Sequence, residues 1–226
     1  MIPIIGFVGD KKSGKTAVLE TVIAELKKKG GKVGVIKHTT HGFQLDYPRT
    51  DSAKLAKAGA KKVVLLGHGR IGLYGQEKRE PGPEQVRDLY LSDLDLVLLE
   101  GFKNALVPKV LVALNAPAPK WAKETGGLIA AVSSKKTGLK LKHFKPGQTK
   151  QLAKLIESYI KTHRAKREVK IYLDGKPLQI KPFIKDFCLN TITGMIGSLH
   201  HSAGARRIQI SIHLPKGLSV PLPGGR

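Results

Sequence analysis

Cysteine is almost missing from this sequence: Cys188 is the single one among 226 residues. One cysteine excludes an internal disulfide and any metal site built on several cysteine ligands. Its place in an apolar helical pattern predicts a small core residue. Aromatic residues are also scarce, at 5% of the chain, which is few for the stacking platforms on which proteins bind single-stranded nucleic acid.

Long apolar runs are missing as well. No run approaches the roughly eighteen residues that a helix needs to cross a membrane. The first apolar run ends at Val8 and follows no basic segment, which is unlike a secretory signal peptide. We therefore expect a cytoplasmic protein without a membrane segment.

Acidic residues are few relative to basic ones. The chain has 17 Asp and Glu against 40 Lys and Arg, a formal net charge of +23. Such a charge attracts polyanions, and the candidates are nucleic acid, a membrane surface and phosphorylated metabolites. The basic residues are spread along the chain rather than gathered in one arm, so general nucleic-acid binding is permitted without being favoured.

What is present predicts an α/β fold. Residues 1–165 alternate short β-branched runs with helical patterns, which is typical of a P-loop NTPase-like, mostly parallel sheet flanked by helices. Strands are predicted at residues 2–8, 32–37, 61–67, 70–75, 93–102, 108–114 and 127–134. Helices are predicted after residue 14, over 52–59, from the segment 79–85 and around 152–160. A turn at 67–69 is expected to join two of the strands as a hairpin.

A charged segment at residues 161–168 is typical of a linker. Beyond it, a hairpin around Asp174, a helix and a final alternating strand predict a small ββαβ module. We therefore divide the chain into a P-loop nucleotide-binding domain, 1–165, and a small C-terminal α+β module with a flexible tail, 166–226. A core of that size alone is rarely sufficient, so we expect the module to pack on the first domain or on another subunit.

Residues 9–16, GDKKSGKT, match the phosphate-binding pattern G-x-x-x-x-G-K-[ST]. The motif follows a buried-strand pattern and precedes a helical one, as a P-loop does. Its glycines let backbone N–H groups converge on phosphate oxygens at the positive end of the helix. The predicted phosphate-binding residues are Gly9, Asp10, Lys11, Lys12, Ser13, Gly14, Lys15 and Thr16.

The chemistry of this loop predicts a nucleoside triphosphate with Mg²⁺. Lys15 would reach the β- and γ-phosphates, and the Thr16 hydroxyl would ligate the metal. Glu100 ends an apolar strand pattern and is the candidate acid that holds the metal or its waters. The alternative for Glu100 is a solvated carboxylate at a strand end.

Further candidates lie at predicted strand ends and in the loops that follow. Gly101 would let backbone approach the γ-phosphate, and Lys37 and His38 follow the second strand at the edge where such sheets collect ligands. Asp51 either positions metal or water or caps the helix that it precedes. Asp46 is a second candidate for positioning metal or water.

For some other residues the sequence does not decide between two roles. His38 and His41 are three apart and suggest a metal, but no third ligand is evident. Lys135 and Lys136 either stack along a base and sugar or are solvated. Trp121 has no partner motif and is expected to be a packing residue.

Three blocks of sequence, GDKKSGKT, VIKHTTHGFQLDYPRTDSAKLAKAGA and LDLVLLEGFK, resemble in this order the MobB family of molybdopterin-guanine dinucleotide biosynthesis adaptor proteins. The resemblance covers residues 2–165. It implies a GTP-binding, usually dimeric P-loop protein that assists the nucleotidyltransferase MobA as it joins GMP from GTP to molybdopterin. It also implies that residues 9–16 bind GTP phosphates, with roles for Lys37, His38, Asp51 and Glu100.

The chain departs from the family in one block. Family members usually read P-G-K-D-S where this chain has residues 48–52, PRTDS, so a glycine's close backbone approach is not available there. Guanine specificity follows from the resemblance alone, because the sequence has no N-K-x-D base-reading motif, and Asn115 is at best a weak candidate for the base.

The sequence is compatible with three functions. The leading one is a GTP-binding accessory protein, at most a weak GTPase using Lys15 and Glu100, since no arginine finger or catalytic base is evident. The second is a P-loop small-molecule kinase with Asp46 or Asp51 as the base. The third is a basic module that binds nucleic acid or protein through its charge.

Overall fold

The computed structural model of the chain describes residues 2–40, 42–43, 50–115, 117–163, 169–174, 176–199 and 208–214. These residues form two compact units, Met1–Lys166 and Arg167–Arg226.

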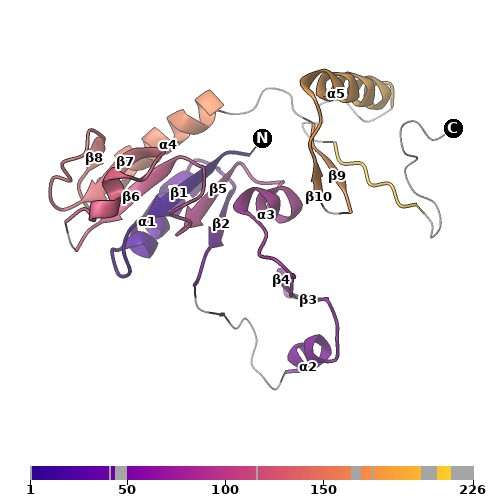
Figure 1. The fold of residues 1–226 in the computed structure, drawn as a ribbon, viewed down its shortest axis with the longest axis horizontal. Coiled ribbons are helices and arrows are strands. Elements are labelled where there is room, and N and C mark those ends of the chain that lie inside the picture. The colour runs from indigo at the N-terminus through magenta and orange to yellow at the C-terminus, as the bar shows by residue number, and fades with distance from the viewer. Residues whose placement is uncertain are drawn as a thin grey trace. The chain divides into compact units, whose positions relative to one another are not determined.

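The first unit is built on a six-stranded sheet (Figure 1). Its strands are β1 (Ile4–Val8), β2 (Val33–Lys37), β5 (Leu96–Glu100), β6 (Lys109–Ala113), β7 (Leu128–Ser133) and β8 (Lys142–Phe144). They lie in the order β2-β5-β1-β6-β7-β8, and every neighbouring pair is parallel. The predicted α/β fold with a mostly parallel sheet is confirmed.

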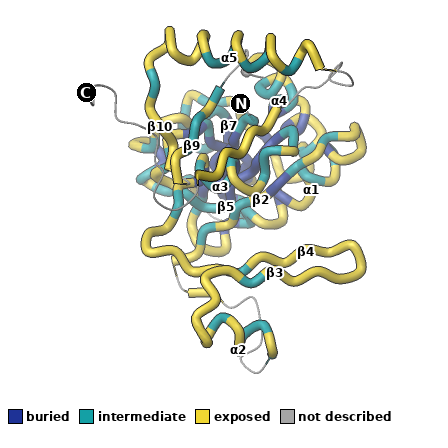
Figure 2. The backbone as a smooth tube through the Cα atoms, turned by 90° about the vertical axis from the view of Figure 1, so that its right-hand side faces the viewer, coloured by how far each residue is buried: buried dark blue, intermediate teal, exposed yellow. Residues whose placement is uncertain are grey.

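Helices cover both faces of this sheet. On one face α1 (Lys15–Lys27) and α4 (Thr149–His163) pack on side chains that include Ile5 and Phe7. On the other, the alternate side chains Ile4 and Val97 pack with residues around α3 (Pro83–Tyr90) and the loop after β5. The short helix η1 (Lys120–Lys123) packs near Leu111. Both faces are covered, so the central strands are buried (Figure 2).

The predicted hairpin is confirmed and forms a sheet of its own. Strands β3 (Lys62–Gly67) and β4 (Arg70–Gly75) are antiparallel. His68 and Gly69 between them have φ of 48° and 72°, as a hairpin turn that matches the twist of the strands requires. The hairpin follows α2 (Asp51–Lys57) and keeps most of its side chains exposed (Figure 2).

Three local expectations need correction. The cap of α2 is Thr50 rather than Asp51: its extended backbone places the hydroxyl to accept from the Ala53 N–H at 3.3 Å. Helix α4 runs to His163, into the predicted linker. The short strand β8 was not expected, because three residues are too few to show a period.

The second unit contains a hairpin and a helix. Strands β9 (Ile171–Leu173) and β10 (Lys176–Leu178) are antiparallel, and α5 (Pro182–Gly197) follows. Residues 208–214, the described part of the last predicted strand, form no strand. An alternating pattern gives a strand only where an edge is available to pair with it.

Cys188 was expected in a core, but it is partly exposed, and α5 has no buried residue. Across the described residues, no helix is both long and apolar enough to cross a membrane.

Candidate functional site

The loop between β1 and α1 is a tight turn with two residues in the left-handed region. Lys12 and Gly14 have positive φ values of 63° and 91°. A Cβ at Gly9 would lie 2.2 Å from the carbonyl oxygen of Val112, and one at Gly14 would lie 2.6 Å from Leu114 Cδ1. At Gly9 a Cβ would overlap a backbone atom, and at Gly14 the positive φ disfavours any other residue while Leu114 would also have to move, so the fold favours glycine at both positions of the motif.

The loop leads directly into the first turn of α1. Gly14 is the N-cap residue, no side chain caps the helix, and no acid lies in its first turn. The N–H groups at a helix start carry partial positive charge and need partners. A phosphate group can supply such partners, and it is the ligand that this position favours.

Lys15 folds back over the loop. Its ammonium group donates to the carbonyl oxygens of Gly9 at 3.0 Å and Asp10 at 2.7 Å. The charge therefore lies over the loop rather than in bulk solvent. An ammonium at this place can exchange carbonyl partners for phosphate oxygens with only a small movement of the side chain.

Glu100 meets Thr16 at the start of the helix. The Thr16 hydroxyl donates to Glu100 Oε1 at 2.8 Å, and Lys37 Nζ lies 3.4 Å from the same oxygen. The contact follows from the sheet, because β5 is a neighbour of β1 and Glu100 pairs in register with Phe7. A hydroxyl and a carboxylate are the hard oxygen ligands that Mg²⁺ prefers.

These two groups would not form a complete metal site by themselves. Within the described residues, no group of three or more His, Cys, Asp or Glu side chains could hold a metal ion. Magnesium usually keeps several waters and binds through one or two protein groups plus substrate phosphates. The donor set therefore fits a metal that arrives with a nucleotide better than a resident one.

His38 and Gly101 lie at the same edge. The His38 N–H donates to the Glu100 carbonyl, and the Gly101 N–H donates to Phe7, both at 3.0 Å. Gly101 has a φ of 94°, so it is suited to the tight turn after β5. The His38 ring lies 3.4 Å from Glu80 Oε1 and 5.0 Å, between centroids, from Phe102.

Asp51 is not brought to this loop. Its carboxylate pairs with Lys54 at 2.9 Å on α2, and its side chain is 92% exposed. His41, Asp46 and the residues 48–49 lie outside the described residues. Lys135 and Lys136 are exposed beyond β7.

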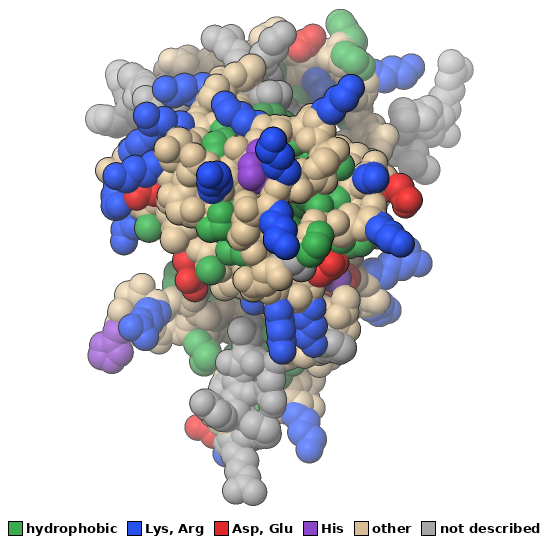
Figure 3. Space-filling view, turned by 90° about the vertical axis from the view of Figure 1, so that its left-hand side faces the viewer, with side chains coloured by type: hydrophobic (Ala, Val, Ile, Leu, Met, Phe, Trp, Pro, Cys, Tyr) green, Lys and Arg blue, Asp and Glu red, His purple; other side chains and the backbone are tan. Residues whose placement is uncertain are grey.

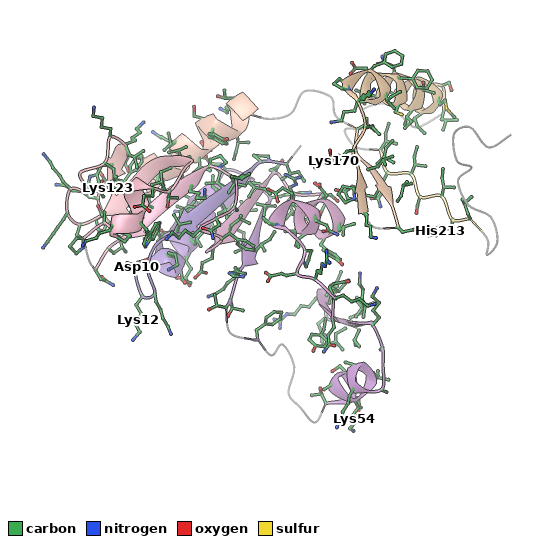
Figure 4. The ribbon with its side chains drawn as sticks, viewed as in Figure 1. Asp10, Lys12, Lys54, Lys123, Lys170 and His213 are labelled. Carbon is green, nitrogen blue, oxygen red and sulfur yellow. The ribbon has the colours of Figure 1, made fainter. Side chains whose placement is uncertain are left out.

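Three further residues contact the loop or its neighbours. The sequence did not assign Trp121 or Lys103 to the site, and it offered Asn115 only as a weak candidate for the base. The Trp121 indole N–H donates to Asp10 Oδ1 at 2.8 Å, and Lys103 Nζ lies 4.0 Å from the centroid of that ring. Asn115 Nδ2 donates to the Lys12 carbonyl at 3.1 Å, so it supports the loop. Figure 4 labels Asp10 and Lys12 on the turn ahead of α1.

The positions of Lys103, Asn115 and Trp121 after predicted strands could have indicated that they lie near the loop. All three follow β5 or β6, the two neighbours of β1 in the sheet. Residues after the carboxyl ends of such strands gather around a ligand site.

Comparison with known proteins gives the same assignment as the motifs. Residues 4–134 match the family model described as MobB, molybdopterin guanine dinucleotide synthesis protein B. A molybdopterin-guanine dinucleotide biosynthesis adapter protein from Haemophilus influenzae is 36% identical over 123 residues, which are 53% of this chain and 69% of that protein. A putative adapter protein of the same kind from Methanocaldococcus jannaschii is 25% identical and matches 94% of this chain and 98% of its own.

Solved structures resemble more than two thirds of the chain. A crystal structure of molybdopterin-guanine biosynthesis protein B (mobB) has a TM-score of 0.55 at 26% identity and covers 70% of this chain and 99% of its own. The crystal structure of Bacillus subtilis MobB has a TM-score of 0.55 at 28% identity, with 69% of this chain and 96% of its own covered.

Proposed function

Since the chain belongs to the MobB family, we propose that it binds GTP with Mg²⁺ at residues 9–16 as an accessory protein of molybdopterin guanine dinucleotide biosynthesis. In this role it assists a MobA-type nucleotidyltransferase that joins GMP to molybdopterin, and its own hydrolysis of GTP is slow. GTP as the ligand implies a cytoplasmic location.

The observation that carries the proposal is the contact of Thr16 with Glu100, 2.8 Å long, beside the loop. It places a metal-binding hydroxyl and carboxylate next to a helix start without a side-chain cap. Backbone N–H groups would bind the phosphates, and Lys15 would transfer its hydrogen bonds from loop carbonyls to phosphate oxygens. The metal would neutralise charge on the phosphates.

Slow hydrolysis is expected from the partners of the loop. In the described part of the chain, the side chains from outside the loop that form hydrogen bonds with residues 9–16 are those of Glu100, Asn115 and Trp121, and none of them is an arginine. An arginine that reaches the transferred phosphate accelerates hydrolysis by several orders of magnitude. Of the two candidate bases of the kinase alternative, Asp51 pairs with Lys54 on its own helix, and Asp46 lies outside the described residues.

Nucleotide binding to the full chain tests the proposal. We expect wild type to bind GTP with Mg²⁺ in calorimetry, and Lys15→Ala to lose at least tenfold in affinity, since each charge-assisted hydrogen bond contributes about 1.5–3 kcal/mol. Lys27→Ala is the matched control, because it removes the same charge from the exposed end of the same helix. Equal binding by Lys15→Ala and Lys27→Ala would contradict the phosphate role of the loop, and tighter binding of ATP than of GTP would contradict the guanine assignment.

The accessory role needs its own assay. We expect the chain to increase the rate at which a MobA-type enzyme forms the dinucleotide, and Lys15→Ala to lose that increase while Lys27→Ala keeps it. Stimulation by Lys15→Ala equal to wild type would separate the accessory role from GTP binding.

We also propose that the chain is a homodimer through its hairpin. Leu66 and Ile71 are each 76% exposed, and a groove of about 400 Å³ lies between the hairpin and α2. Exposed apolar surface of this kind marks an interaction site. Light scattering should give a dimer for wild type and a monomer for Leu66→Glu with Ile71→Glu, whereas a monomeric wild type would exclude the dimer.

A further inference from the structure

A carboxylate at the second position of a phosphate-binding loop is unfavourable. Asp10 directly follows Gly9, and its negative charge would repel the phosphates that the loop is built to hold. It could also pair with the loop lysines, Lys11, Lys12 and Lys15, and compete with phosphate for them. Among the described contacts, the Asp10 carboxylate does not pair with a lysine of the loop. Its partner is the Trp121 indole N–H, at 2.8 Å.

Trp121 is held in place from two sides. Its ring packs against the buried side chains of Leu111, Ala122 and Ala131. Lys103 Nζ lies 4.0 Å from the ring centroid, close enough for a cation–π contact. The indole N–H is therefore a fixed donor, and it takes the Asp10 carboxylate as its acceptor without using any lysine of the loop.

Given the GTP site proposed above, we infer that Trp121 is a positioning residue for it: the indole N–H holds the Asp10 carboxylate and keeps it from Lys15 and from the phosphates. Lys15 bonds to the backbone carbonyl of Asp10 at 2.7 Å and not to its carboxylate, so its ammonium stays available to the ligand. Loss of the indole N–H would release a negative charge beside the phosphate site.

A packing role alone makes a different prediction. If Trp121 only fills space over Leu111 and Ala131, its replacement lowers stability, and the charge at residue 10 has no bearing on the result. If it restrains Asp10, the effect of removing the indole N–H depends on the carboxylate being present. A double-mutant cycle measures this dependence directly.

The experiment uses four full-length proteins: wild type, Asp10→Asn, Trp121→Phe and the double variant. Phenylalanine keeps most of the packing and removes the N–H. Affinity for Mg²⁺ with GTP is measured by displacement of a fluorescent GTP analogue. We expect Trp121→Phe to bind about tenfold more weakly, because the released carboxylate would repel the phosphates and compete for Lys15, and the double variant to recover to within about threefold of wild type. Asp10→Asn alone should stay within about threefold of wild type.

Equal fold-changes for Asp10→Asn in the two backgrounds, or unchanged binding by Trp121→Phe, would overturn the inference. A second measurement does not depend on the folding of Trp121→Phe. Trp121 is the only tryptophan, so its indole N–H gives one NMR resonance. We expect that proton to exchange slowly with solvent in wild type with GTP and faster in Asp10→Asn. Equal exchange rates in the two proteins would contradict the restraint.

The result is separable from that for the proposed function. If wild type binds GTP through Lys15 but the effects of the two substitutions on affinity are additive, the nucleotide site stands and only the role of Trp121 is refuted. Wild type that binds no GTP removes the nucleotide site itself.

Discussion

Glu100→Gln tests the proposed metal site most directly. The amide is nearly isosteric with the carboxylate, and its oxygen can still accept from the Thr16 hydroxyl, which now lies 2.8 Å from Glu100 Oε1. The substitution therefore removes charge while preserving the local packing of a side chain that is only 13% exposed. Its second partner, Lys37, at 3.4 Å, loses its ion pair.

Two effects of this change have opposite signs. Loss of a group that holds a metal or its waters costs about 10–100-fold in metal affinity, or about 1.4–2.7 kcal/mol. Without Mg²⁺, removal of a negative charge and release of Lys37 favour the phosphates. We therefore expect Glu100→Gln to bind GTP in EDTA as well as wild type or better, and to lose about 10–100-fold of the affinity that Mg²⁺ adds.

Calorimetric titration of GTP with and without Mg²⁺ measures both quantities. Glu84→Gln, which removes the same charge from the exposed first turn of α3, is the matched control. The same gain from Mg²⁺ in Glu100→Gln and in wild type would refute the metal role. Equal weakening in both conditions would indicate a general loss of the site instead.

Three further predictions concern stability. Gly14→Ala should lower the free energy of unfolding by about 2–4 kcal/mol in urea titrations, because φ is 91° and a Cβ would lie 2.6 Å from Leu114 Cδ1; a loss under 1 kcal/mol would contradict the tight turn. Arg87→Ala should cost about 3–5 kcal/mol, since the guanidinium is 2% exposed and pairs with Asp88 at 2.7 Å, and a cost near zero would show that the site relaxes. Burial lowers the pKa of Lys109 from 10.5, so its contribution to stability is full above pH 10.5 and is lost as the pH falls through the folded-state pKa. Between the folded-state pKa and pH 10.5, the free energy of unfolding of wild type should therefore rise with pH more steeply than that of Lys109→Met. Parallel curves for the two proteins would refute this pH dependence.

The sequence predicts those parts of the site that are local. The loop, its strand and its helix are contiguous, so residues 9–16 show the motif and both flanking periods together. Glu100 could be placed from a distance because parallel strands bring their carboxyl ends to one edge. That rule needs only the direction of the strand and not its register.

The parts that could not be predicted depend on the neighbour order of the strands. Trp121 is 111 residues from Asp10 and reaches it because β6 lies beside β1 and η1 follows β6. Sequence periodicity does not show which strands pair. For the same reason the β3–β4 hairpin was recognised while its separation from the main sheet was not.

Part of the excess positive charge lies at one end of the sheet, where one lysine, Lys142, is on the edge strand itself. Residues 125–156 contain seven lysines and neither Asp nor Glu, and they include β8, an edge strand. Lysine on an edge strand prevents pairing with other chains. In Figure 3 Lys and Arg side chains are spread over the visible face rather than gathered into one patch. Lysines at 11, 12, 15 and 37, beside the proposed phosphate site, attract anions of any kind, so the charge by itself gives no reason to prefer nucleic acid over a nucleotide as the ligand.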